Sequence, residues 1–146
     1  MQEIKIRAMQ PSDLERCAAI EQTALDAWSM QQIADELDFE AARMYVAECG
    51  GQVAGFAAFQ LAADESTLNT ITVDPALRGQ GIGKALLENA LEQLKEQGAV
   101  SCFLEVRVQN TPARSLYRSL AFEEAGLRKG FYKNPADDAV VMVKTL

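Results

Sequence analysis

The sequence predicts an α+β protein built on a mixed, mostly antiparallel sheet with about four helices. Its first half alternates short apolar runs with turn residues, which is typical of an antiparallel meander. A glycine-rich loop then joins a strand to a long helix and a further strand, and such a unit forms a parallel crossover. With 146 residues, the chain fits one domain, so residues 1–146 are expected to fold together.

The first half is expected to contain two short helices and four strands. Ser12 and Glu15 have the spacing of a capping box, ahead of a helix whose apolar positions reach Leu25. Ser29 and Gln32 repeat that spacing ahead of a second short helix. Strands are expected at 4–6, 44–49, 53–61 and 68–73, with a hairpin turn at 50–51 and a polar connection at 64–66.

The second half begins where Asp74-Pro75 ends the fourth strand, because proline lacks an N–H donor. A long helix follows the loop at 78–83 and stops at Gly98. Strands are expected at 101–107, 122–127 and 139–144, and a helix runs from 110–112 to about Leu120. The long helix has an apolar stripe formed by Ile82, Leu86, Leu87, Ala90, Leu91 and Leu94.

Composition excludes several functions. The chain has no histidine, which rules out Ser-His-Asp and Cys-His catalysis and histidine-ligated metals. Cys17, Cys49 and Cys102 show no CxxC spacing, so we expect no metal site and three small core residues. The net charge of -7 disfavours direct binding to nucleic acid. No apolar run approaches the ~20 residues of a membrane span, and the N-terminus lacks an apolar signal segment, so a cytoplasmic location is expected.

The segment Arg78-Gly79-Gln80-Gly81-Ile82-Gly83 is the most informative one. At a helix start it offers free N–H groups and the positive end of a dipole, which suits a pyrophosphate. It fails the Walker A pattern, because Gly83-Lys84 is followed by alanine. Its GxGxG spacing also differs from the GxGxxG of a dinucleotide fold. A βα turn without any ligand remains the alternative.

This loop resembles the acetyl-CoA loop of the GNAT N-acetyltransferase superfamily. Leu104-Glu105-Val106-Arg107, then Asn110, Leu116-Tyr117 and Phe122, are similar to the signature of the RimI-like ribosomal-protein-alanine N-acetyltransferases. Departures from that pattern are Ala121 for glycine, Phe131 for a tyrosine and Ala27 for proline. Further similar elements are Ala27-Trp28-Ser29, Phe131-Tyr132, Asp138-Ala139 and Met142.

The resemblance implies a GNAT-like sheet with a splayed parallel strand pair. It also implies an enzyme that moves the acetyl group of acetyl-CoA, without a metal, to the N-terminal amine of a ribosomal or other protein that begins with alanine. Acetylation of a lysine or a small amine is one alternative, and a non-catalytic CoA-binding regulatory module is another. An α-amine has a pKa near ~7.8 and a lysine near ~10.4, so lysine costs about 3.5 kcal/mol more to deprotonate at neutral pH. A weak carboxylate base therefore suits an α-amine better. The oligomeric state stays open.

By the same resemblance, Glu105 is the candidate base and Tyr117 the candidate acid that protonates the leaving thiolate. Strand alternation places Phe103, Glu105 and Arg107 on one face, so Glu105 has the alternative of a surface pair with Arg107. Tyr117 has the alternative of a core aromatic. Trp28 and Tyr132 are expected to line the acceptor pocket or simply to pack. The residues expected to bind the cofactor are Ile71, Thr72, Val73, Arg78, Gly79, Gln80, Gly81, Ile82, Gly83, Lys84 and Asn110, the last of which also suits a helix cap.

Overall fold

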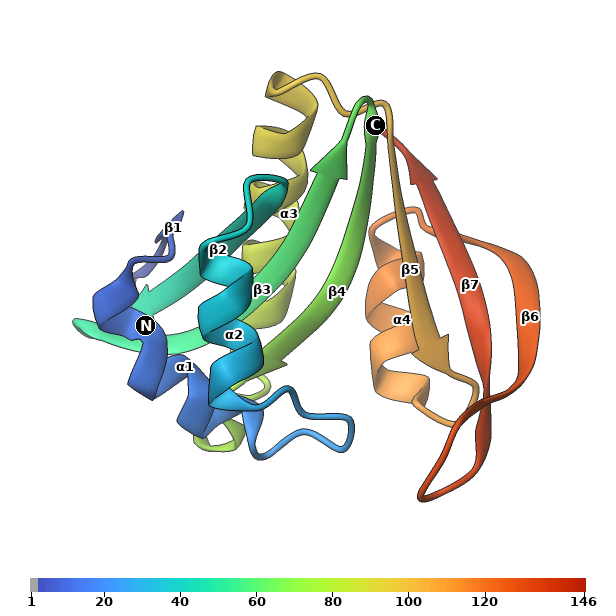
Figure 1. The fold of residues 1–146 in the computed structure, drawn as a ribbon, viewed down its shortest axis with the longest axis horizontal. Coiled ribbons are helices and arrows are strands. Elements are labelled where there is room, and N and C mark those ends of the chain that lie inside the picture. The colour runs from blue at the N-terminus through green and yellow to red at the C-terminus, as the bar shows by residue number, and fades with distance from the viewer. Residues whose placement is uncertain (1–2) are drawn as a thin grey trace.

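The structure, a computed structural model, describes residues 3–146. Over these residues the strands form one seven-stranded sheet with the order β1-β2-β3-β4-β5-β7-β6, in which only β4 and β5 pair in parallel (Figure 1). The strands are β1 (Ile4–Ala8), β2 (Ala42–Cys49), β3 (Gln52–Ala62), β4 (Glu65–Val73), β5 (Ser101–Arg107), β6 (Glu123–Tyr132) and β7 (Asp137–Thr145). The α-helices are α1 (Leu14–Glu21), α2 (Met30–Leu37), α3 (Ile82–Glu96) and α4 (Thr111–Ser119), with short 3-10 turns at Pro11–Asp13 and Pro75–Leu77. The predicted mixed α+β class is confirmed.

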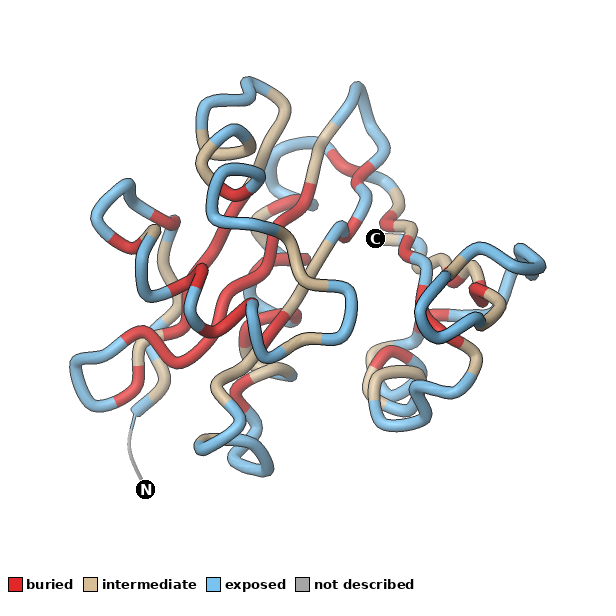
Figure 2. Tube along the Cα trace, turned by 60° about the horizontal axis from the view of Figure 1, so that its bottom comes forward, coloured by how far each residue is buried: buried red, intermediate tan, exposed pale blue. Residues whose placement is uncertain are grey.

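Helices cover both faces of the sheet. Helices α1 and α2 pack on one face of the N-terminal strands, and α3 and α4 pack on the opposite face (Figure 1). Residues 53–59 of β3 are therefore buried on both sides, whereas β6 lies at an edge and is almost wholly exposed (Figure 2). Over residues 3–146, the chain forms no helix with the length and apolar character needed to cross a bilayer.

The sequence patterns that predicted helices α2 and α3 are confirmed. All six apolar stripe residues of α3 are buried, and Gly98 just beyond it has φ 101°. The Ser29 hydroxyl accepts a hydrogen bond from the Gln32 N–H at 3.1 Å, and the Gln32 side-chain oxygen accepts one from the Ser29 N–H at 2.7 Å, which completes the predicted capping box. The three cysteines are all buried, as predicted for core residues.

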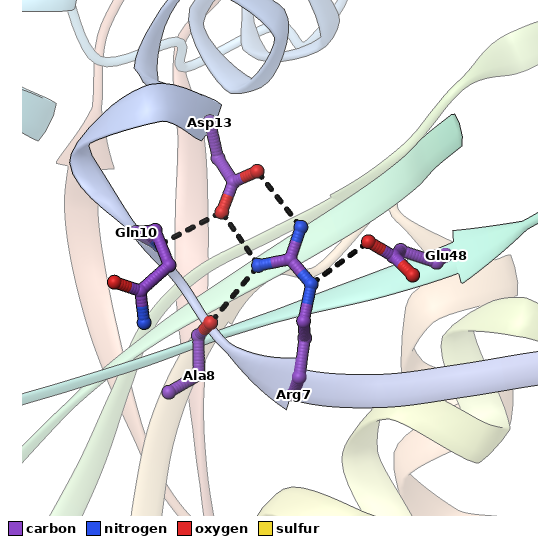
Figure 3. A network of polar contacts seen from close by, with 5 residues as sticks. All are labelled: Arg7, Ala8, Gln10, Asp13 and Glu48. Carbon is purple, nitrogen blue, oxygen red and sulfur yellow. Dashed lines mark hydrogen bonds and ion pairs between the residues drawn. The ribbon is translucent and has the colours of Figure 1, made fainter. Parts of the chain in front are cut away.

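The predicted Ser12–Glu15 capping box is wrong. Asp13 accepts hydrogen bonds from the Gln10 N–H (2.8 Å) and from the Arg7 guanidinium (2.8 and 2.9 Å), and Arg7 also binds Glu48 of β2 (Figure 3). This network fixes a 3-10 turn that contains Ser12, so α1 begins only at Leu14. The predicted extension to Leu25 is also wrong, because α1 ends at Glu21 and Leu25 is exposed.

Six of the described strands are longer than expected, and β4, β6 and β7 exceed the prediction by three residues or more. A two-residue turn at Ala63-Asp64 lets β4 begin at Glu65, so the polar connection predicted at 64–66 belongs largely to the strand. Ser66 is fully buried there and donates a hydrogen bond to the Ser101 carbonyl of β5 (2.8 Å). Strand β6 continues to Tyr132, and strand β7 already begins at Asp137. The two strands pair with each other beyond their apolar residues, which explains the extra length.

Candidate active site

A cleft opens where β4 and β5 separate. Their parallel pairing runs only from Glu65 with Ser101 to Leu68 with Leu104, and the strands then diverge (Figure 1). This is the splayed pair that the resemblance implied. The cleft has a volume of about 940 Å³. The predicted site residues that line it are Trp28, Ile71, Thr72, Glu105, Asn110, Tyr117 and Tyr132.

The β4 wall presents backbone groups that β5 does not pair. The N–H of Asp74 donates to the Ala54 carbonyl of β3 (2.7 Å). Because successive residues of a strand point their backbone groups to opposite sides, those of Val73 and Ile71 face the cleft. An extended ligand with amide groups can therefore add to this edge as a further strand would.

Thr72 has a different role, because its hydroxyl donates to the buried Glu21 carboxyl at 2.5 Å. Glu21 also accepts from the Thr70 hydroxyl (3.1 Å) and from the Trp28 N–H (3.1 Å). One carboxyl group thus joins the end of α1, the connection to α2 and the β4 wall. Sequence reasoning missed Glu21, since its partners on β4 lie about 50 positions away in the chain.

The glycine-rich loop lies beside the end of β4. Gly79 and Gly81 have φ values of 80° and 79°, and no atom lies within 4 Å of the position that a Cβ would take on either one. The first intrahelical bond of α3 runs from Ala85 N–H to the Gly81 carbonyl, so the amides just before Ala85 have no intrahelical acceptor. A Cβ on Gly83 would lie 3.7 Å from the Val73 side chain, which places the start of α3 against the end of β4, and none of residues 78–84 is among those that line the cleft.

The remaining loop residues have varied surroundings. Arg78 and Gln80 are exposed, and the Ile82 side chain is buried in the core, which leaves only its backbone for a ligand. Lys84 lines a separate cavity of about 500 Å³ between α3 and the end of β7.

Asn110 caps α4 by accepting from the Ala113 N–H (3.3 Å) and also lines the cleft.

Glu105 projects from β5 on the face that α1 and α2 cover. Its side chain is 32% exposed, and its Oε2 lies 3.4 Å from Nε of Arg128 on β6. A pair this long and this exposed binds weakly, so the carboxylate stays accessible from the cleft. The alternative of a pair with Arg107 is wrong, because Arg107 binds Asp26 instead.

Tyr117 lies on α4 at the opposite side of the same cleft. It is buried, packs edge-to-face against Phe122 with ring centroids 5.8 Å apart, and still contributes to the cleft wall. Burial, with smaller contributions from Tyr132 and Cys102, raises the pKa of the Tyr117 hydroxyl well above its ordinary value of 10.0. The hydroxyl therefore keeps its proton at neutral pH and can act as an acid.

The cleft mouth combines aromatic and charged side chains. Tyr132 stacks on the Arg107 guanidinium, whose carbon lies 4.4 Å from the ring centroid, and Trp28 lines the same cleft. Burial is the main cause that raises the pKa of Tyr132 to about 12, and the carboxylates of Asp26 and Glu105 add to the effect. Within residues 3–146, no three potential ligands of the His, Cys, Asp or Glu type gather to hold a metal ion.

The sequence profile described as the acetyltransferase (GNAT) family matches residues 12–122, most of the chain. The chain belongs to this acetyltransferase family. The predicted family, fold and class of enzyme, an acyltransferase, are confirmed.

Two similar proteins and one solved structure agree with this assignment. The [ribosomal protein bS18]-alanine N-acetyltransferase of Escherichia coli K12 is 36% identical over 140 residues, which cover 94% of each chain. The enzyme of that name from Haemophilus influenzae is 38% identical and covers 94% of this chain and 95% of its own. The crystal structure of the ribosomal-protein-S18-alanine N-acetyltransferase from Escherichia coli superposes with a TM-score of 0.91 at 35% identity and covers 98% of this acetyltransferase and 94% of that chain.

Proposed function

We propose that this acetyltransferase transfers the acetyl group of acetyl-CoA to the N-terminal α-amine of a protein, with alanine as the preferred first residue. The observation that carries the proposal is a single cleft that holds both a solvent-accessible carboxylate, Glu105, and a buried protonated phenol, Tyr117. The similar Escherichia coli enzyme is named for alanine acetylation of a ribosomal protein, which supports the same class of acceptor here.

The residues around the cleft fit acetyl-CoA. The free amides at the start of α3 and the open space over Gly79 and Gly81 suit the pyrophosphate, and Arg78 and Lys84 add positive charge nearby. The cleft-facing backbone groups of Ile71 and Val73 suit the amides of the pantetheine arm. When bound there, acetyl-CoA would supply an activated acetyl thioester to the cleft that Glu105 and Tyr117 line.

Glu105 and Tyr117 divide the proton transfers between them. Glu105 accepts a proton from the incoming ammonium, directly or through a water molecule, because its carboxylate is the accessible base on the acceptor side. The Tyr117 hydroxyl holds the proton that the departing sulfur needs. A carboxylate is a weak base, so this pair favours an α-amine with pKa near ~7.8 over a lysine near ~10.4.

Electrostatics favour a basic acceptor. The chain carries a net charge of -7, which attracts cationic proteins such as those of the ribosome during encounter. Four carboxylates and two arginines line the cleft, so a negative charge remains there that favours entry of an ammonium group; they are Asp26, Glu65, Glu105, Asp137, Arg107 and Arg128. An N-terminal peptide with basic residues beyond its first position therefore suits this surface.

The acceptor class can be tested with synthetic peptides that differ only in their first residue and carry basic residues downstream. We expect kcat/KM with acetyl-CoA to be highest for alanine, the residue for which the similar Escherichia coli enzyme is named, and at least about tenfold lower for a bulky first residue. Equal rates for all first residues, or no transfer to any of them, would contradict the proposal.

The donor site can be tested with Gly81→Val. The added side chain would occupy the open space over the loop, so we expect calorimetry to show at least about a tenfold loss of acetyl-CoA affinity. Gly51→Val is the matched control, because Gly51 in the β2–β3 turn has the same φ of about 80° and equally open surroundings, remote from the cleft. It imposes the same backbone strain and should leave the affinity unchanged. Equal affinities for the wild type and Gly81→Val would mean that the loop does not hold the pyrophosphate.

A further inference from the structure

A charged and aromatic cluster bridges the two sides of the cleft mouth. Arg107 of β5 donates from Nε to Oδ2 of Asp26 (2.9 Å) and from Nη2 to Oδ1 (2.8 Å). Its Nη1 also donates to the Pro135 carbonyl (2.8 Å), and its Nη2 to the Lys133 carbonyl (3.3 Å). One side chain therefore binds both the connection between α1 and α2 and the turn between β6 and β7.

This arrangement depends on the shape of arginine. The Arg107 side chain is 8% exposed and that of Asp26 is 46% exposed, so a nearly buried cation relies on a carboxylate at the edge of the cleft. The planar guanidinium satisfies the carboxylate in a bidentate manner and reaches two carbonyls as well. A lysine ammonium keeps the charge but cannot reproduce these four bonds at once.

Arg107 also sets the position of Tyr132. The guanidinium lies over the Tyr132 ring, and Phe131 packs edge-to-face against the same ring with centroids 5.0 Å apart. Tyr132, Glu105 and Asp26 line the same cleft. The cluster thus holds an aromatic wall beside the carboxylate that receives the proton of the acceptor.

We propose that Arg107, through its pair with Asp26, is a positioning residue that builds the binding site for the acceptor's N-terminus. This inference rests on the proposed function of the cleft. The α1–α2 connection belongs to the β1–β4 side of the splay, and the β6–β7 turn belongs to the other side. Breaking the pair releases the two walls from each other, and in Asp26→Asn it also leaves the Arg107 cation unpaired where an ammonium must enter. Both effects weaken acceptor binding and leave the donor side untouched.

The test compares Asp26→Asn, Arg107→Gln and the double variant in steady-state kinetics with an alanine-initiated basic peptide. Each single variant should raise the peptide KM about tenfold, as expected for a lost charge-assisted bond, with kcat changed less than about threefold. The acetyl-CoA dissociation constant should stay within about twofold. The peptide KM of the double variant should be no higher than that of the more impaired single variant, because both single changes remove the same interaction. Arg107→Lys should behave like Arg107→Gln, and Asp26→Glu should recover much of the wild-type KM.

A matched control separates positioning from general destabilisation. Asp13→Asn removes one partner of another bidentate pair, between Arg7 and Asp13, with the same bond lengths of 2.8 and 2.9 Å but on β1, outside the cleft (Figure 3). It should lower the melting temperature without raising the peptide KM. Amide hydrogen exchange adds a measurement that needs no acceptor peptide. The amides of residues 22–29 and 133–136 should exchange faster in Asp26→Asn and in Arg107→Gln than in the wild type. In Asp13→Asn their exchange rates should be unchanged.

Several outcomes would overturn the inference. These are an unchanged peptide KM in both single variants, an equal rise in the KM of peptide and acetyl-CoA, or unchanged hydrogen exchange at both segments. A wild-type enzyme that transfers nothing to an α-amine would instead overturn the proposed function. In that event the hydrogen-exchange comparison still decides whether the Asp26–Arg107 pair holds the two segments together.

Discussion

Replacing Glu105 by glutamine is expected to lower kcat/KM for an alanine-initiated peptide about 10²–10⁴-fold at pH 7, because the amide cannot accept the proton of the ammonium. Activity should recover in part as the pH rises above ~8, where an α-amine loses its proton unaided. The side chain is partly exposed and its pair with Arg128 is long, so little stability is lost. Steady-state rates measured from pH 6 to 10 check both expectations.

Glu124→Gln is the control for this experiment. Glu124 also pairs with arginines, Arg114 at 2.6 Å and Arg118, but it lies on β6 away from the cleft lining. Its replacement should leave the rate and the pH profile as they are in the wild type. A Glu105→Gln enzyme with the wild-type pH profile would show that Glu105 is not the base.

Tyr117→Phe is expected to lower kcat by about 10²–10⁴-fold while acetyl-CoA affinity stays within about twofold. Phenylalanine keeps the ring and its edge-to-face contact with Phe122 but removes the proton. The pKa of Tyr117 is raised, and a raised pKa means that the protonated, active form persists to higher pH. The wild-type kcat should therefore show no decline near pH 10, where an ordinary tyrosine would ionise.

Tyr45→Phe controls for the loss of a buried hydroxyl. Tyr45 on β2 is as buried as Tyr117 and packs edge-to-face on Phe59, but it does not line the cleft. Turnover should be unaffected by this change. If Tyr117→Phe also turns over at the wild-type rate with chemistry shown to limit that rate, then Tyr117 serves packing alone.

Local patterns predicted the elements that carry the site. The apolar period of α3, the Ser29–Gln32 cap and the alternation of β5 all depend on neighbours within a few positions, and the structure confirms each of them. The departure at Ala121 falls at φ 71°, a left-handed conformation that favours glycine, which gives a physical reason for glycine at this position of the family pattern.

The contacts that shape the acceptor side could not be predicted in the same way. Asp26 and Arg107 lie 81 positions apart, and Glu21 and Thr72 lie 51 apart, so no local spacing indicates either contact. At Ser12 a local spacing did predict a helix cap, but the prediction was wrong. The Arg7–Asp13 network holds this segment in a 3-10 turn instead. Polar contacts that sequence periodicity does not record decided both matters, over long range for Asp26 and Glu21 and over six positions for the Arg7–Asp13 pair.

The most direct test of the central claim is to map the acetyl group on one product peptide. The substrate would be a peptide that begins with alanine, has a free α-amine and contains one internal lysine, incubated with acetyl-CoA and the wild-type protein at pH 7. Tandem mass spectrometry should place nearly all of the acetyl group on the α-amine, because that amine is the more readily deprotonated one. Acetyl groups found mainly on the lysine side chain would contradict the proposal that this cleft acetylates protein N-termini.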